Sequence, residues 1–327
     1  MNIRDRRAIH ETAQQALGRA ENSQHIILIY SAVCCGLSLI ATVLTALLSD
    51  QISGTGGLGN IGLRSVLSTG QSVLPLVNLV VTACLNLGYH TAILSYTRGF
   101  EASARTLSGG FRHFGVVLRS MLLQGVVYCG IALTATYLSS FIFLATPFAE
   151  GFMEVMEPHL SSMTVLDTGI VLDESVMMAA MESIMPMMWI LLGVCLLLIV
   201  PVYYRFRMVN FALADDPRKG AFHAMVKSRQ LMRRNCISLF RLDLTLWWFY
   251  AGQVLVSLIC YGDLLLPLIG ITFPWSNEIS YYLFYGLSLV AQFALYYFGM
   301  NRVYSVYAVA YDVLQEDLLQ PNYPVQM

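Results

Sequence analysis

The sequence predicts an all-α membrane protein, a single bundle of six transmembrane helices with both termini in the cytoplasm. Three observations predict this fold class. Apolar residues make up 57% of the 327-residue chain and charged residues only 12%, about half the charged share of a soluble globular domain. Six apolar runs are long enough to cross a bilayer, and the basic residues gather in alternate connectors. Lipid is therefore the expected solvent of most of the chain.

The six apolar runs predict the six spans. A helix of about 20 apolar residues crosses the hydrocarbon core of a bilayer, and each run carries Lys, Arg, Asp or Glu only at its ends. In chain order the predicted spans are residues 25–48, 73–96, 120–148, 186–204, 242–261 and 281–302. The first run has no convincing cleavage site after it, so we expect it to remain in the membrane as a helix.

The connectors predict the orientation, because Lys and Arg are retained on the cytoplasmic side of a membrane. Of the 19 basic residues, all but Arg64 precede the first span, lie between spans two and three or four and five, or end span six. The loop of residues 149–185, between spans three and four, is acidic and rich in Met. Both patterns predict cytoplasmic termini and an outer acidic loop.

The basic loop of residues 205–241 contains a predicted amphipathic surface helix. Asp216 and Pro217 are typical of a helix start. Beyond them apolar residues recur at helical spacing, namely Ala221, Phe222, Met225 and Met232. The basic residues expected to contact anionic lipid headgroups or a cytoplasmic protein partner are Lys219, Lys227, Arg229, Arg233 and Arg234. The alternative is an ordinary positive-inside loop that happens to be helical. The segment before the first span, with Ala13, Ala16, Leu17 and Ala20, is a weaker example of the same pattern.

Two stretches carry a resemblance to a known family. The first is Ala214-Asp215-Asp216-Pro217, Ala224, Ser228-Arg229-Gln230-Leu231-Met232 and Leu239-Phe240-Arg241-Leu242-Asp243-Leu244. The second runs from Leu87-Gly88 through Arg98-Gly99 to Ser108-Gly109-Gly110-Phe111. These residues resemble domain-of-unknown-function family 975, integral membrane proteins of bacteria. The resemblance implies a helical bundle in a bacterial plasma membrane but no activity, because the family has none assigned. The long outer loop departs from the family pattern, so a function of that loop would not carry over.

Polar residues along two predicted spans indicate a face that points into the bundle. Asn78, Asn86 and His90 share one face of span two, and Gln292 lies on a polar face of span six. Polar groups in hydrocarbon are costly unless they are paired. Hydrogen bonds between helices explain such faces. The functional alternative is a polar cavity at mid-membrane with His90 as its titratable group.

No catalytic, nucleotide or metal motif is specific enough to name a reaction or a cofactor. The spacing of Gly54, Gly56 and Gly59 matches a dinucleotide-binding turn, but it has no strand before it and is better explained as a flexible connector. The seven cysteines form neither a disulfide framework nor a zinc spacing. Methionines of the outer loop could bind Cu(I), although Met is also a common filler of interfacial helices.

The leading hypothesis from these patterns is a non-enzymatic protein of the interaction or assembly class, because the charge lies on surfaces and not in a buried site. Its expected partners are anionic membrane lipids and, alternatively, a cytoplasmic protein. A nucleic-acid partner is not expected. The net charge of -1 says nothing about nucleic acid, because charge matters here by its position along the chain and not by its sum. A small transporter that uses the polar faces of spans two and six is the second hypothesis. A membrane-embedded enzyme is the third.

Overall fold

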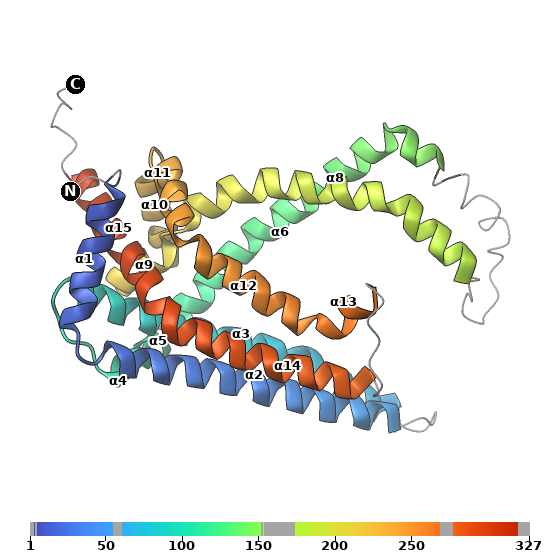
Figure 1. Ribbon diagram of the computed structural model, residues 1–327, viewed down its shortest axis with the longest axis horizontal. Helices are drawn as coiled ribbons and strands as arrows, with labels where there is room; N and C mark the ends of the chain where they lie inside the picture. The colour runs from blue at the N-terminus through green and yellow to red at the C-terminus, as the bar shows by residue number, and fades with distance from the viewer. Residues whose placement is uncertain are drawn as a thin grey trace. The chain divides into compact units, whose positions relative to one another are not determined.

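The computed structural model describes residues 3, 5–54, 61–151, 153, 174–268 and 277–319. Every regular element within these ranges is a helix, which confirms the predicted all-α class (Figure 1). Six of the described helical stretches are long and apolar enough to cross a membrane, as predicted. They are Ser23–Ser49, Leu67–Thr97, Phe114–Leu144, Met185–Asp215, Cys236–Cys260 and Ile279–Leu319.

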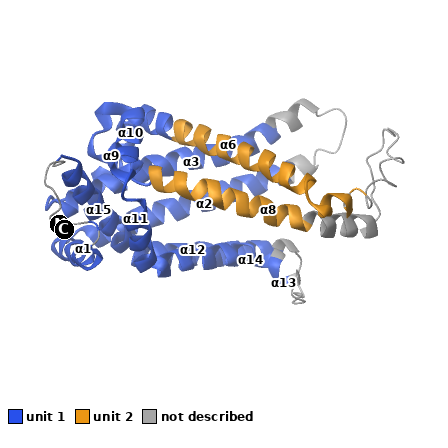
Figure 2. Ribbon diagram, turned by 90° about the horizontal axis from the view of Figure 1, so that it is seen from above, with its two compact units in different colours: residues 1–120, 206–327 blue, residues 121–205 orange. Residues whose placement is uncertain are grey.

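The chain forms two compact units (Figure 2). Unit 2, Met121–Arg205, holds most of two long helices, α6 (Phe114–Leu144) and α8 (Glu174–Phe206). Unit 1 comprises Met1–Ser120 and Phe206–Met327. Its helices are α1 (Arg6–Arg19), α2 (Ser23–Gly54), α3 (Ile61–Thr97), α4 (Ala104–Leu107), α5 (Gly109–Arg112), α9 (Val209–Asp215), η2 (Pro217–Lys219), α10 (Gly220–Met232), α11 (Cys236–Asp243), η3 (Leu244–Leu246), α12 (Trp247–Cys260), α13 (Gly262–Leu268), α14 (Asn277–Leu295), the π-helix η4 (Tyr296–Met300) and α15 (Asn301–Leu319).

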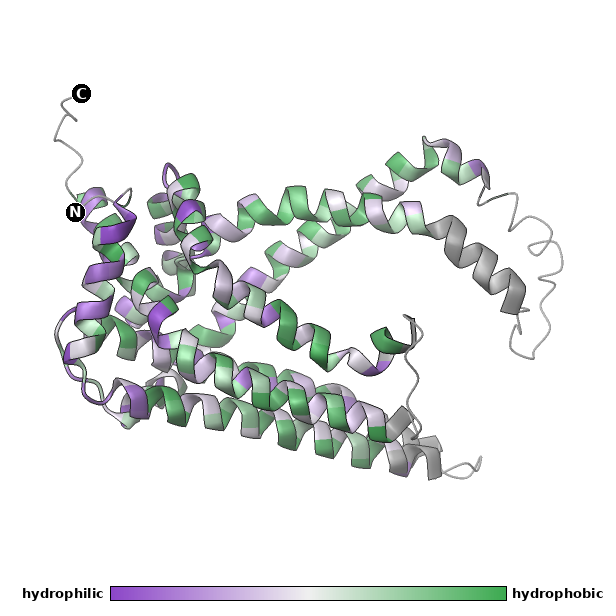
Figure 3. Cartoon of the chain, viewed as in Figure 1, coloured by the Kyte–Doolittle hydropathy of each residue, from purple (hydrophilic) through white to green (hydrophobic). Residues whose placement is uncertain are grey.

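The long helices of unit 1 expose much of their apolar surface. Helix α2 packs against α3 and α14, and α14 packs against α12. Large side chains along these helices nevertheless remain open, among them Ile40 (57% exposed), Leu76 (60%) and Val290 (67%). Exposed apolar surface of this extent is unusual on a soluble monomer. Figure 3 shows the apolar colouring along α2, α12 and α14, as expected of helices that lipid surrounds.

The shorter helices form a polar end cluster around α15. We define the end cluster as α1, α4, α5, α9, α10, α11 and α15, which lie together at one end of unit 1 (Figure 1). Helix α15 contacts α1, α3 and α10. The largest fully buried side chains lie here and at the adjoining ends of α2 and α3, including Tyr89, Tyr307, Tyr311 and Leu239. The tightly packed core of unit 1 is therefore at one end of the long helices.

The helix bounds differ from the predicted spans where packing continues past the apolar run. The sixth predicted span ends at Arg302, but α14, η4 and α15 form one continuous helical stretch from Asn277 to Leu319. The extension is stabilised because Val303, Val306 and Val313 are buried in the end cluster. The fifth predicted span begins at the end of α11 and continues into α12. The 3-10 turn η3 separates these two helices.

Two glycines allow backbone contact between α3 and the short helices α4 and α5. A Cβ atom on Gly88 would lie 2.1 Å from the main-chain oxygen of Leu107, and one on Gly110 would lie 1.9 Å from that of Cys84. Neither main-chain atom can move as freely as a side chain. Both glycines belong to the second stretch that resembles the family, so this stretch encodes a close helix contact.

We therefore expect Gly88→Ala and Gly110→Ala each to destabilise the full-length protein by on the order of 3 kcal/mol, the upper end of the usual cost of overpacking. The measurement is the free energy of unfolding in mixed detergent micelles. Gly109→Ala is the matched control, since its Cβ would meet nothing within 4 Å. Equal stability of the Gly110 and Gly109 variants would contradict the close contact.

Candidate functional site

Asp215 is the centre of an ion-pair cluster that joins four helices. It ends α9, and its Oδ1 lies 2.7 Å from Arg98 Nη1 at the end of α3. Its Oδ2 lies 3.0 Å from Lys227 Nζ on α10 and accepts a hydrogen bond from the Tyr311 hydroxyl on α15. Arg98 also lies 2.7 Å from Asp312 of α15. We call Arg98, Asp215, Lys227, Tyr311 and Asp312 the Asp215 cluster.

The Asp215 cluster is partly shielded from water. The side chains of Asp215 and Lys227 are 14% and 17% exposed, and that of Arg98 is 34% exposed. Burial disfavours the charged guanidinium, but hydrogen bonds and charge interactions with Asp312 and Asp215 outweigh it and raise the pKa of Arg98 above its ordinary value. Each carboxylate of the cluster therefore has a cationic partner, and the arrangement suits a structural role.

A second buried cluster surrounds Arg207, directly after α8. Its guanidinium donates to the Tyr250 hydroxyl and lies 4.5 Å from the centre of the Tyr307 ring. The Tyr307 hydroxyl donates to Asp243 Oδ1 at 2.7 Å and is hydrogen-bonded to that of Tyr250. Asp243 is only 9% exposed. A buried carboxylate and cation held by hydrogen bonds are costly to break, so this cluster ties α12 to α15.

The predicted polar face of α3 enters a packed aromatic core. Asn86 Oδ1 accepts a hydrogen bond from the Tyr30 hydroxyl at 3.0 Å, and His90 Nδ1 donates to the main-chain oxygen of Asn86 at 2.6 Å. The His90 ring lies between Phe211 and Tyr304, with ring centres 4.7 and 5.1 Å away. His90 is 3% exposed. Asn86 and His90 thus join helices by packing and hydrogen bonds and line neither of the grooves described below.

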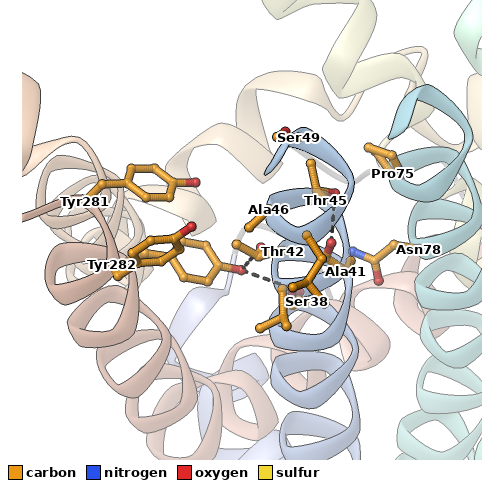
Figure 4. Close-up of a pocket in the computed structure, with 13 residues that line it drawn as sticks. Ser38, Ala41, Thr42, Thr45, Ala46, Ser49, Pro75, Asn78, Tyr281 and Tyr282 are labelled. Atoms are coloured by element: carbon orange, nitrogen blue, oxygen red, sulfur yellow. Dashed lines mark hydrogen bonds between the residues drawn. The ribbon is translucent and has the colours of Figure 1, made fainter. Parts of the chain in front are cut away.

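Asn78 lies apart from that core, in an open groove between α2, α3 and α14. The groove has a volume of about 1190 Å³, and Thr42, Thr45 and Tyr285 line it. Figure 4 shows Thr42 and Thr45 of α2 near Asn78 of α3. Thr42 donates to the Tyr285 hydroxyl at 2.6 Å, which in turn donates to the main-chain oxygen of Ser38 at 3.1 Å. The Oδ1 atom of Asn78 is buried and has no hydrogen-bond partner among the described residues.

Gln292, the fourth predicted polar residue, lines none of these features. Its Nε2 atom is also buried without a partner in the described part of the chain. The structure therefore brings Asn86 and His90 together and separates both from the groove that Asn78 lines.

The basic residues predicted to form a contact surface divide into two groups. Lys227 is turned inward to Asp215, and Lys219 Nζ lies 3.1 Å from Asp216, whose pKa it lowers through this hydrogen bond. Arg229, Arg233 and Arg234 are exposed and form no ion pair within the described residues.

The apolar residues of the predicted amphipathic helix divide in the same way. Ala221, Met225 and Met232 are buried, and α10 packs against α9 and α15. Phe222 is 72% exposed, and Ile237, early in α11, is 70% exposed. We call Phe222, Arg229, Arg233, Arg234 and Ile237 the basic face. Most of the apolar side of α10 thus stabilises the end cluster, and the basic face is what remains open to a partner.

The Met-rich loop of residues 149–185, predicted to lie outside, is only partly described. Gly56 and Gly59 of the glycine motif also lie outside the described residues. Residues 154–173 lie outside the described residues, and residues 174–185 belong to the first turns of α8. The hypothesis of metal binding by this loop stays a prediction.

Within the described residues, six apolar helical spans and a polar end cluster define a multi-pass helical membrane protein. The family described as "Protein of unknown function (DUF975)" matches residues 1–292. The chain belongs to this family, which confirms the resemblance found in its residues. Comparisons with curated proteins and with solved structures find no match.

Sequence reasoning did not find the Asp215 cluster as a unit. Arg98 and Asp215 each belong to a stretch that resembles the family, and the structure pairs them. Asp243, near the start of the fifth predicted span, is buried and accepts a hydrogen bond from the Tyr307 hydroxyl. The signal available in the sequence was the repeated Tyr at positions 304, 307 and 311, which share one side of a helix.

Proposed function

We propose that the chain is a non-enzymatic protein of the interaction or assembly class in a bacterial plasma membrane, which contacts anionic lipid headgroups through the basic face. The observation that carries the proposal is the division of the cations in this region. Lys227 has a structural partner, whereas Arg229, Arg233 and Arg234 have no ion-pair partner in the described part of the chain. Exposed Phe222 and Ile237 beside these arginines match the chemistry of a surface that lies on headgroups.

The transport alternative receives less support from the geometry. A polar route would need the polar residues of α3 and α14 to share one cavity. Asn86 and His90 are hydrogen-bonded in a packed core, and the groove between α2 and α14 reaches only Asn78. The described residues bring together no group of three His, Cys, Asp or Glu side chains that could hold a metal ion. The enzyme alternative and metal binding by the methionines of residues 149–185 stay predictions.

The proposal predicts that anionic lipid protects the basic face. We expect phosphatidylglycerol in nanodiscs of phosphatidylcholine to slow amide hydrogen exchange of residues 229–237 in the full-length protein by several-fold, since each arginine near an anionic surface contributes about 1 kcal/mol. The variant Arg229→Gln, Arg233→Gln, Arg234→Gln is expected to lose this protection.

The matched control removes the same charge elsewhere. Arg6, Arg7 and Arg105 are also exposed, and their replacement by Gln should leave the protection of residues 229–237 unchanged. Equal loss in both triple variants would show that bulk charge alone accounts for the effect. Absence of any lipid-dependent protection in the wild type would favour a cytoplasmic protein as the partner.

Cytoplasmic termini are part of the proposal and rest on the distribution of Lys and Arg. We expect green fluorescent protein fused to the C-terminus to fluoresce and alkaline phosphatase at the same position to be inactive in bacterial cells. Alkaline phosphatase inserted within residues 149–185 should be active. The reverse pattern would overturn the orientation and place the basic face outside.

A further inference from the structure

A second polar groove runs beneath α1, where the end cluster meets the long helices. It consists of two cavities, of about 530 and 250 Å³, that share Gln14, Leu17 and Arg302. The larger one opens between α1, the first residues of α2 and the π-helix η4, and the smaller one between α1, η3 and α15. We call the two cavities together the α1 groove. Their volumes suit a small polar headgroup.

Arg302 is the cation of the α1 groove. Arg302 is exposed and forms no ion pair within the part of the chain that the structure describes. Other polar groups of the groove include the side-chain amide of Gln14 and the hydroxyl of Thr245, which lies 2.7 Å from His10 Nε2. Ser23, Gln24, Tyr297, Asn301 and Ser305 also line it. Burial lowers the pKa of His10.

No Asp or Glu is among the residues that line either cavity. The groove therefore offers one positive charge and several hydrogen-bonding groups, but no carboxylate that could receive an ammonium group. This distribution fits a phosphate diester whose headgroup carries no positive charge. It does not fit a choline or ethanolamine headgroup, whose cation would have no counter-charge here.

The place of the groove in the fold fits a lipid. Arg302 ends the apolar run of residues 281–302, and Ser23, at the start of the first span, lines the same groove. Tyr297 and Trp248 also line it, and these residue types gather where a membrane meets water. Phe298 of η4 lines the larger cavity and is 71% exposed. Val290, on the preceding helix α14, is 67% exposed, so the helical stretch that carries Phe298 offers apolar surface to acyl chains.

We propose that the α1 groove binds one anionic phospholipid, with the phosphate at Arg302 and the acyl chains along η4 and α14. This site shares no residue with the basic face. The proposal therefore goes beyond the proposed function and can be tested independently of it.

The test uses Trp248 as a reporter inside the groove. Replacing Trp189, Trp247 and Trp275 by Phe leaves Trp248 as the single tryptophan of the full-length protein. In phosphatidylcholine nanodiscs we expect phosphatidylglycerol with brominated acyl chains to quench its fluorescence at about ten-fold lower mole fraction than brominated phosphatidylcholine, the ratio expected of one charge-assisted hydrogen bond. Arg302→Gln should abolish this preference, and Arg302→Lys should retain part of it.

Two controls localise the effect. Arg19→Gln removes an exposed charge at the end of α1 that does not line the groove, and it should leave the preference unchanged. The triple Gln variant of the basic face should also leave the preference for phosphatidylglycerol unchanged. The two proposals can therefore fail independently of each other. If the single-tryptophan variant does not fold, native mass spectrometry replaces the quenching experiment. It counts the phosphatidylglycerol molecules that the wild type and Arg302→Gln retain, and the variant should retain fewer.

Three results would overturn the proposal. Equal quenching by the two brominated lipids would show that the groove does not select an anionic headgroup. An unchanged preference in Arg302→Gln would remove Arg302 from the site. Complete loss of the preference on addition of millimolar inorganic phosphate would identify a site for soluble phosphate in place of a lipid.

Discussion

The ion pair between Arg98 and Asp215 is the contact on which the arrangement of the end cluster depends. It joins the end of α3 to the end of α9, and through Lys227 and Asp312 it extends to α10 and α15. The long helices expose much apolar surface, whereas the largest fully buried side chains of unit 1 gather at this end. Hydrogen-bonded charges in a poorly hydrated site have a defined geometry, which can fix the angle of one helix against the next.

The ion pairs and hydrogen bonds inside unit 1 determine which charged residues are left to contact a partner. Arg98, Lys227 and Arg207 have partners within unit 1, and Asn86 and His90 are hydrogen-bonded inside its core. The cations left open at the level of the end cluster include the arginines of the basic face and Arg302 of the α1 groove. These arginines are the groups on which both proposals of phosphate contact rest.

The sequence was sufficient for the class of fold but not for the contacts. Hydropathy and helical spacing are local signals, and they predicted the six spans and the inward direction of Asn86 and His90. Arg98 and Asp215 are 117 residues apart, and no local pattern connects two charges at that distance. The same limit explains α10: its periodicity identified an apolar side, but only the packing of α9 and α15 decides that Met225 is buried while Phe222 is exposed.

A double-mutant cycle on Arg98 and Asp215 tests the central claim most directly. The stabilities of Arg98→Gln, Asp215→Asn and the double variant would be measured by unfolding in mixed detergent micelles, with Asp216→Asn as the neighbouring surface control. The account predicts that the two substitutions couple by about 1–3 kcal/mol, as residues within one ionic network do. Additive effects, or a loss of stability in Asp216→Asn as large as that in Asp215→Asn, would contradict it.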